Sequence, residues 1–192
     1  MYDILISYQT VYNLIGEIME STINKLLKEM TIEEKAGQLS IGFNNAFIDE
    51  STVDIDEARS GKIGLLPHFN DIDLQNEIQR AAIEETRLGI PILFCQDVIH
   101  GYKTAFPIPW GEAMSWEPEL AEETAAAAAR EAAYGGVKLT FAPMVDIARN
   151  AFWGRICEGA GEDTYLGSAF AYSRVKGFQG DDVSNPEKIA AC

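Results

Sequence analysis

The sequence is poor in basic residues. Its 192 residues contain 15 Lys and Arg against 30 Asp and Glu, which gives a formal net charge of −15 at pH 7. Nucleic acids and anionic membranes are bound through clustered Lys and Arg, so we expect no nucleic-acid and no membrane partner. The 47% of hydrophobic residues is typical of a folded domain with a sizeable core.

Cysteines and known cofactor motifs are also scarce. Cys95, Cys157 and Cys192 are odd in number and have no metal-ligand spacing, which argues against a disulfide framework and a zinc site. The chain has no phosphate-binding loop, no GxGxxG turn after a strand, and no HExxH or GxSxG motif. We therefore expect no metal and no cofactor.

The first twenty residues do not resemble a leader sequence. They have no basic n-region and carry Asp3, and no apolar run in the chain approaches the length of a membrane span. This predicts a cytoplasmic protein, and secreted or periplasmic homologues are compatible with it. Residues 1–20 are assigned as an extension of unknown role, either an amphipathic helix through Leu14, Ile15, Ile18 and Met19 or a segment that does not pack.

Helices and strands alternate from residue 21 onward. Apolar residues recur at helical spacing up to Met30, and Thr31 with Glu34 forms a capping box that opens a helix through Leu39. Residues 43–60 are predicted to be irregular. The predicted strands cover residues 61–66, 90–95 and 137–142, and a fourth begins at residue 188.

Three longer helices are predicted between these strands. One begins at Asp71 or Asp73, one runs from Pro118 to the Gly135-Gly136 pair, and one runs from Asp163 to about residue 178. In the first, the expected buried positions are Leu74, Ile78, Ala81, Ala82 and Ile83. Strands that alternate with crossover helices predict an α/β fold with a parallel sheet.

Asp97 is the leading candidate for a functional residue. It follows a predicted buried strand, and the carboxyl ends of such strands commonly hold ligands. Its carboxylate suits two sugar hydroxyls, and the alternative is that it caps the loop backbone. His100 is interpreted as loop support in preference to a general base. His68, after the first strand, is a weaker candidate of the same kind.

A second cluster follows the third predicted strand and contains Arg149, Trp153, Gly154 and Arg155. The planar fork of Arg suits adjacent hydroxyls, and Trp offers a flat face to a sugar ring. Alternatively, an Arg pairs with Glu158, Glu162 or Asp163 and fixes the loop. A catalytic carboxylate pair among Asp97, Asp146, Glu158 and Glu162 stays open, because the sequence does not give their separation.

Several motifs, taken in order, resemble glycoside hydrolase family 3. They are MTIEEKAGQL at 30–39, DVIHGY at 97–102, FPIP at 106–109, SWEPEL at 115–120, FAPMVDIAR at 141–149 and WGR at 153–155, then Glu158-Gly159 and Gly161-Glu162-Asp163. The resemblance covers residues 21–192. It implies the N-terminal part of a (β/α)8 TIM-like barrel, with about three βα units plus the start of a fourth strand.

The resemblance also implies roles and an activity. Asp97 matches the family aspartate that binds sugar hydroxyls, Arg155 matches the sugar-binding arginine of the WGR motif, and His100 and Trp153 are assigned to loop support. The implied reaction is the retaining hydrolysis of terminal non-reducing β-D-glucosyl residues, with a β-linked glucoside or oligosaccharide as substrate. Asn150-Ala151-Phe152 departs from the usual DPR of the family.

The catalytic residues of the family match positions beyond Cys192. These are the nucleophile, the acid/base and a sugar-binding Lys-His pair, so the chain by itself is predicted to be inactive. The alternatives are a non-catalytic truncated product or sugar-binding fragment, and a β-xylosidase of the same family.

Overall fold

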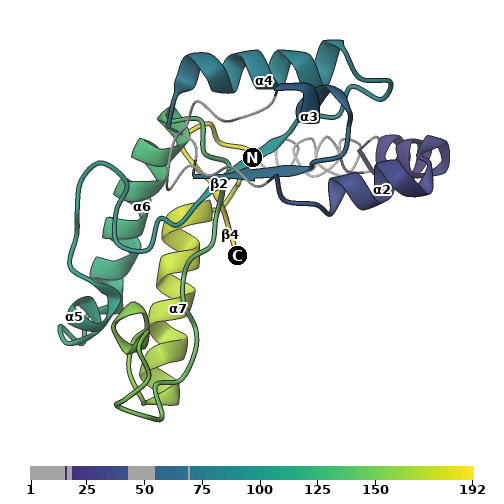
Figure 1. The fold of residues 1–192 in the computed structure, drawn as a ribbon. Coiled ribbons are helices and arrows are strands. Elements are labelled where there is room, and N and C mark those ends of the chain that lie inside the picture. The colour runs from purple at the N-terminus through teal and green to yellow at the C-terminus, as the bar shows by residue number, and fades with distance from the viewer. Residues whose placement is uncertain (1–15, 17–18, 43–54, 69) are drawn as a thin grey trace, which may run out of the picture.

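The chain folds around a four-stranded parallel sheet (Figure 1). The computed structural model describes residues 16, 19–42, 55–68 and 70–192. The strands lie side by side in chain order and are β1 (Leu65–Pro67), β2 (Leu93–Gln96), β3 (Leu139–Thr140) and β4 (Ala190–Ala191). Three βα units followed by a fourth parallel strand form an open part of a barrel, which confirms the predicted fold class.

The first strand begins later than predicted. It was expected from residue 61, but it starts at Leu65 because the preceding residues pass close to the end of a helix. Gly64 allows this approach, since a Cβ there would lie 2.2 Å from the carbonyl oxygen of Gln38. The other strands are also shorter than expected. Single backbone hydrogen bonds extend the pairing beyond their ends, such as that from Lys138 N to Phe94 O at 2.9 Å.

A short segment before β1 extends the sheet on its outer side, which the sequence did not predict. Ile41 pairs with Leu65 in parallel orientation, and Gly42 N donates to Leu65 O at 2.8 Å. Irregular structure was predicted for residues 43–60, and this was wrong for Ile55–Arg59, which form helix α3. Residues 43–54 lie outside the described part of the chain.

The predicted helix starts are confirmed, and those at Thr31, Asp71 and Asp163 have side-chain capping bonds. In α2 (Ile32–Gln38), Thr31 Oγ1 accepts from Glu34 N and Thr31 N donates to the Glu34 carboxylate. Asp71 caps α4 (Ile72–Glu84), Pro118 begins α6 (Pro118–Tyr134), and Asp163 caps α7 (Thr164–Gln179). Two short helices were not predicted, α5 (Pro109–Ala113) and the 3-10 turn η2 (Ile156–Glu158).

The N-terminal region is helical over residues 19–29, and its apolar residues Ile23 and Leu27 are about half exposed. Most of the predicted extension, residues 1–15, 17 and 18, lies outside the described part of the chain.

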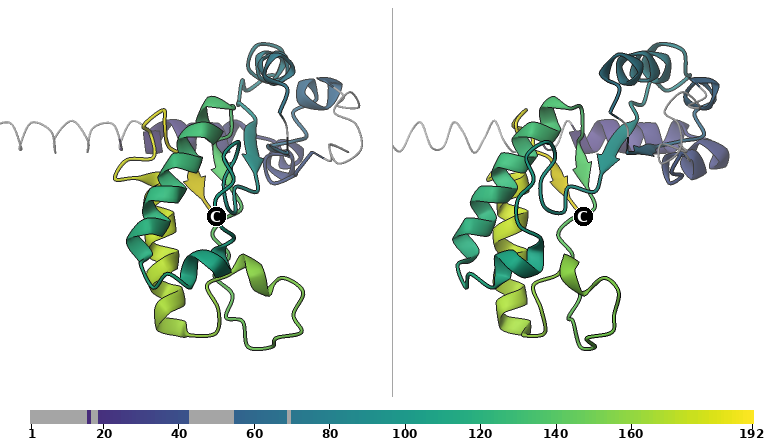
Figure 2. Two further views of the ribbon diagram at one scale, coloured as in Figure 1. Left: turned by 90° about the vertical axis from the view of Figure 1, so that its left-hand side faces the viewer. Right: turned by 60° about the vertical axis from the view of Figure 1, so that its left-hand side comes forward.

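Helices α6 and α7 pack side by side along one side of the sheet (Figure 2). Their contact is close because α6 presents alanines and α7 presents Gly177, where a Cβ would lie 2.4 Å from the backbone oxygen of Glu122. The core behind them contains Val98, Val137, Phe178 and Ile189. This packing fixes the ends of the strands on which the candidate site lies.

One predicted core position is exposed instead. In α4, Ile78, Ala81 and Ala82 are buried as expected, but Ile83 is 48% exposed because it falls on the opposite face of the helix. The face toward the core includes Gln75, whose amide donates to Gly135 O at 3.1 Å. A polar side chain with a hydrogen-bond partner is tolerated in a core, and the sequence pattern alone does not reveal it.

Candidate functional site

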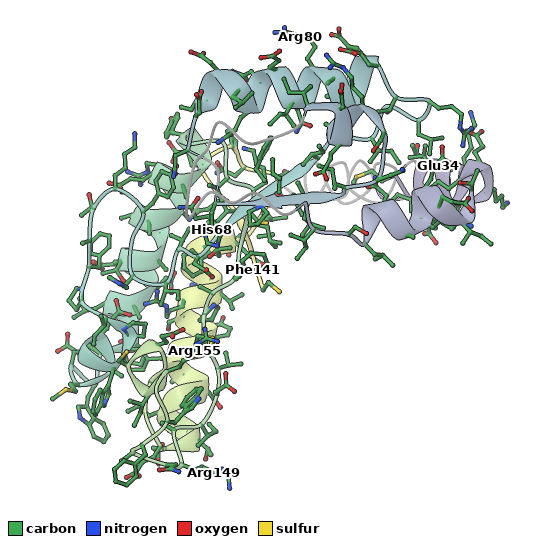
Figure 3. The ribbon with its side chains drawn as sticks, viewed as in Figure 1. Glu34, His68, Arg80, Phe141, Arg149 and Arg155 are labelled. Carbon is green, nitrogen blue, oxygen red and sulfur yellow. The ribbon has the colours of Figure 1, made fainter. Side chains whose placement is uncertain are left out.

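The residues directly after the first three strands meet at one edge of the sheet. His68 follows β1, Asp97 follows β2 and Phe141 follows β3. Backbone bonds continue the ladder through this edge, from His68 N to Cys95 O at 2.9 Å and from Phe141 N to Gln96 O at 3.2 Å. Figure 3 shows His68 and Phe141 at this edge, with Arg155 below them. The carboxyl edge of a parallel sheet is where such folds bind ligands.

Asp97 presents a half-exposed carboxylate at this edge. Its side chain is 45% exposed, and Oδ2 lies 3.3 Å from Nε2 of His68. Its charge also acts on the residue two positions earlier, because burial first and Asp97 second raise the pKa of the Cys95 thiol to about 11. Asp97 therefore sits between solvent and the buried end of β2, with polar contacts on one side.

Arg155 is held by a carboxylate of its own loop. Its Nε and Nη2 donate to the two oxygens of Glu158 at 2.8 and 2.6 Å, and Nη2 lies 3.6 Å from the sulfur of Met144. The hydrogen bonds from Glu158 raise the pKa of Arg155, and the charges of Asp97 and Asp146 add to this effect. In turn, Arg155 holds the pKa of the Glu158 carboxyl below its usual value.

The structure identifies which acid of the 143–161 loop pairs with Arg155. Of the three acids considered as partners, Glu158 is the one that binds Arg155. Arg155 is nonetheless 57% exposed, so its pairing does not remove it from the surface. Trp153 is half-buried in the same loop, where its backbone N donates to Asn150 O at 3.0 Å.

Arg149 is separated from the rest of its predicted cluster. It lies at the far tip of the 143–161 loop, away from both His68 and Arg155 (Figure 3). The charge of Asp97 contributes to the raised pKa of Arg155, whereas Arg149 lies away from the site.

His100 stands in the loop after β2 and contacts that loop's backbone. Its Nδ1 lies 3.1 Å from Phe106 O, and Phe106 N donates to His100 O at 2.8 Å. The turn between them requires Gly101, which has φ of 121° and whose Cβ would lie 1.9 Å from Thr104 O. These bonds close the loop into a compact unit.

Two anchors of this loop were missed from the sequence. Glu131 of α6 accepts from Lys103 N, Thr104 N and the Thr104 hydroxyl at 2.9, 2.8 and 2.6 Å. The hydrogen bonds from Thr104 hold the pKa of the Glu131 carboxyl below its usual value. Nothing in the pattern around Glu131 marks it, because its partners lie 27 and 28 residues earlier in the chain.

The second anchor is a buried ion pair. Arg174 of α7 binds the carboxylate of Glu112 in α5 and the carbonyl oxygen of Ile99, and Thr124 donates to the same carboxylate. The side chains of Arg174 and Glu112 are 6% and 5% exposed. Burial lowers the pKa of Arg174, and the charge of Glu112 opposes that shift. This pair ties α5, α6 and α7 to the loop that carries Asp97.

Among the described residues, no group of three or more His, Cys, Asp or Glu side chains could hold a metal ion. Within the same residues, no helix has the length and apolar character needed to cross a membrane. The polar groups described above are the Asp97 carboxylate and the His68 imidazole at the sheet edge, and the Arg155 guanidinium in the loop below it. Such groups bind hydroxyls by donating and accepting hydrogen bonds.

A protein-family model matches most of this chain. Residues 31–189 match the glycosyl hydrolase family 3 N terminal domain. The chain belongs to glycoside hydrolase family 3. The family model begins at the capping box of α2 and ends one residue before β4, so it spans strands β1 to β3 and the candidate site.

Curated proteins named as beta-glucosidases and beta-xylosidases are similar over most of this chain. A protein named periplasmic beta-glucosidase from Salmonella typhimurium is 38% identical over 169 residues, covering 85% of this chain and 21% of the relative. A putative beta-xylosidase from Formosa agariphila is 29% identical, covering 90% of this chain and 26% of the relative. This chain therefore spans about a quarter of the length of these relatives.

Solved structures of a beta-glucosidase and a beta-glucanase share the fold. The beta-glucosidase from Listeria innocua superposes with a TM-score of 0.76 at 33% identity, covering 90% of this chain and 26% of the neighbour. An exo-1,3/1,4-beta-glucanase from a Pseudoalteromonas species gives a TM-score of 0.77 at 27% identity, covering 90% of this chain and 24% of the neighbour.

Proposed function

We propose that this chain forms part of a retaining β-glucosidase and supplies part of the wall that binds the terminal sugar. Asp97 accepts hydrogen bonds from sugar hydroxyls, and Arg155 donates to the same sugar from the loop after β3. The observation that carries this proposal is the placement of the Asp97 carboxylate at the carboxyl edge of the sheet, within the electrostatic reach of Arg155. His100 and Trp153 act as loop supports.

The family and the ligands of a solved relative support the proposed substrate class. The Listeria innocua enzyme has been crystallised with glucose, and a mutant of it with laminaribiose. A carboxylate at the edge of the sheet and a guanidinium in the loop after β3 suit the same chemistry, a neutral sugar with adjacent hydroxyls. We propose a β-linked glucoside or oligosaccharide as substrate, with neither nucleic acid nor membrane as partner.

We assign neither catalytic carboxylate to the 192 residues of this chain. A retaining glycosidase needs a nucleophile and an acid/base about 5 to 5.5 Å apart on either side of the scissile bond. Glu158 is engaged by Arg155, and Asp97 matches a sugar-binding position of the family. The chain then contributes to the binding of both substrate and transition state, and the covalent step uses residues outside it.

The proposal is tested with the complete polypeptide that contains this chain. We expect the wild type to hydrolyse 4-nitrophenyl β-glucoside. Asp97→Ala should lower kcat/KM roughly 10- to 150-fold for each hydrogen bond that the charged carboxylate accepts from the sugar. Asp181→Ala is the matched control, because Asp181 is exposed in the turn between α7 and β4. Equal activity of the wild type and Asp97→Ala would contradict the proposal.

The 192-residue chain alone should give no turnover, and turnover that Asp97→Ala abolishes would overturn that prediction.

A second candidate activity is that of a β-xylosidase, which the Formosa agariphila relative favours. A preference for 4-nitrophenyl β-xyloside over the glucoside would identify it. Sugar binding without turnover by the complete polypeptide would instead support a non-catalytic protein. A cytoplasmic location stays a prediction, and the Salmonella relative is named as periplasmic.

A further inference from the structure

His68 lies beside Asp97 at the tip of the neighbouring strand. Its Nε2 is 3.3 Å from Oδ2 of Asp97, and its side chain is 25% exposed. A carboxylate offers only acceptor atoms, so the nitrogen that faces it carries a proton when the contact is attractive. A distance of 3.3 Å is slightly longer than a usual N–H···O hydrogen bond, and contacts at catalytic sites commonly shorten when a substrate is bound.

The backbone holds His68 in an unusual conformation. Its φ is 55°, in the left-handed region that few residues other than glycine adopt and in which His, Asn and Asp are enriched. Its N–H donates to Cys95 O at 2.9 Å, which continues the β1–β2 ladder by one more bond. Conformations of this kind persist only where the surrounding structure fixes them, and they cluster at functional sites.

We propose that His68 is a positioning residue that fixes the orientation of the Asp97 carboxylate for the sugar. This inference rests on the proposed function. The Asp97 side chain is half exposed and would otherwise sample several rotamers, which costs binding free energy when the sugar fixes one of them. With Oδ2 held by His68, the other oxygen of Asp97 is presented to a hydroxyl in one direction.

Two substitutions separate this contact from the fold. His68→Asn keeps a residue that tolerates a left-handed backbone, but its short side chain does not reach Asp97 as Nε2 does. His68→Gln places an amide N–H donor close to the position of Nε2. In the complete polypeptide, we expect His68→Asn to raise KM for 4-nitrophenyl β-glucoside about tenfold, with kcat changed less than about twofold. His68→Gln should recover most of the loss.

A double-mutant cycle with Asp97→Asn decides whether His68 acts through Asp97. If it does, adding His68→Asn to Asp97→Asn changes KM less than about twofold. Multiplicative effects of the two substitutions overturn this inference and leave the proposed function standing. A loss of activity in both His68 variants with a matching fall in melting temperature also overturns it, because the role is then structural. Wild-type activity in Asp97→Asn overturns the proposed function and this inference with it.

Discussion

We expect Glu112→Gln to destabilise the contact of α5 with α7 by about 3 kcal/mol, because it leaves the Arg174 charge buried without its counter-ion. Both side chains are nearly inaccessible, at 6% and 5% exposure. Removing one partner of such a pair typically costs about 3 to 5 kcal/mol. The lower value applies here because the glutamine oxygen still accepts from Arg174, which also keeps its bond to Ile99 O and its contact with the Phe178 ring at 5.7 Å.

The reverse substitution and the double variant give the size of the coupling. Arg174→Met leaves Glu112 buried with Thr124 as its remaining donor, so we expect a similar cost of about 3 kcal/mol. In Glu112→Gln/Arg174→Met no charge stays buried, and the main loss is the bond to Ile99 O, about 1 to 2 kcal/mol. The double variant should therefore be more stable than either single variant, which is a large departure from additivity.

Hydrogen–deuterium exchange of the amides in α5 and α7 measures this destabilisation locally in the complete polypeptide. A decrease of about 3 kcal/mol in the free energy of local opening increases the exchange rate roughly 150-fold. Glu122→Gln is the matched control, because Glu122 pairs with Lys176 of the same helix α7 at 3.2 Å but at the surface. Exposed pairs contribute at most about 1 kcal/mol. The reasoning fails if both glutamine variants exchange alike, or if the double variant loses the sum of the single losses.

The packing and the pKa shifts support three further predictions. Gly177→Ala should cost about 1 to 3 kcal/mol and lower the melting temperature, whereas Gly111→Ala, with 3.7 Å to the nearest atom, should be nearly neutral. The Thr104 hydrogen bonds lower the pKa of the Glu131 carboxyl, so its contribution to the stability of the loop is present at neutral pH and is lost as pH falls through that lowered pKa. Hydrogen–deuterium exchange in the loop after β2 should increase over that pH range. Glu131→Gln should abolish this pH dependence. Cys95, buried and with a pKa of about 11, should resist iodoacetamide at pH 8 in the folded protein, as mass spectrometry of the peptides would show.

The parts of the fold that depend on local signals were predictable. Thr31, Asp71 and Asp163 each cap a helix with a bond to a backbone N–H three residues later, so the cap is encoded within one turn. The apolar run before Asp97 likewise marked a buried strand. The positions of the strands along the chain were right, and their ends were wrong by up to four residues.

Features that join distant parts of the chain were not predictable. The pairing of Ile41 with Leu65 and the burial of Glu112 against Arg174, 62 residues apart, depend on the assembled sheet. Isolated charges on amphipathic helices are usually exposed, so the pattern gave no reason to bury this pair. The separation of Arg149 from Arg155 also depends on how the 143–161 loop folds back, which the local sequence does not determine.

Arg155 shows why a structural and a functional interpretation of one residue need not exclude each other. The sequence offered them as alternatives, and the structure supports the structural one through two bonds to Glu158. A guanidinium has five N–H donors in one plane, so a carboxylate that takes two of them fixes the direction of the rest. Because Arg155 is also 57% exposed, the same ion pair that stabilises the loop can orient the arginine toward a sugar beside Asp97. On this argument Glu158→Gln should weaken sugar binding even though Arg155 is unchanged, and it should do so through KM.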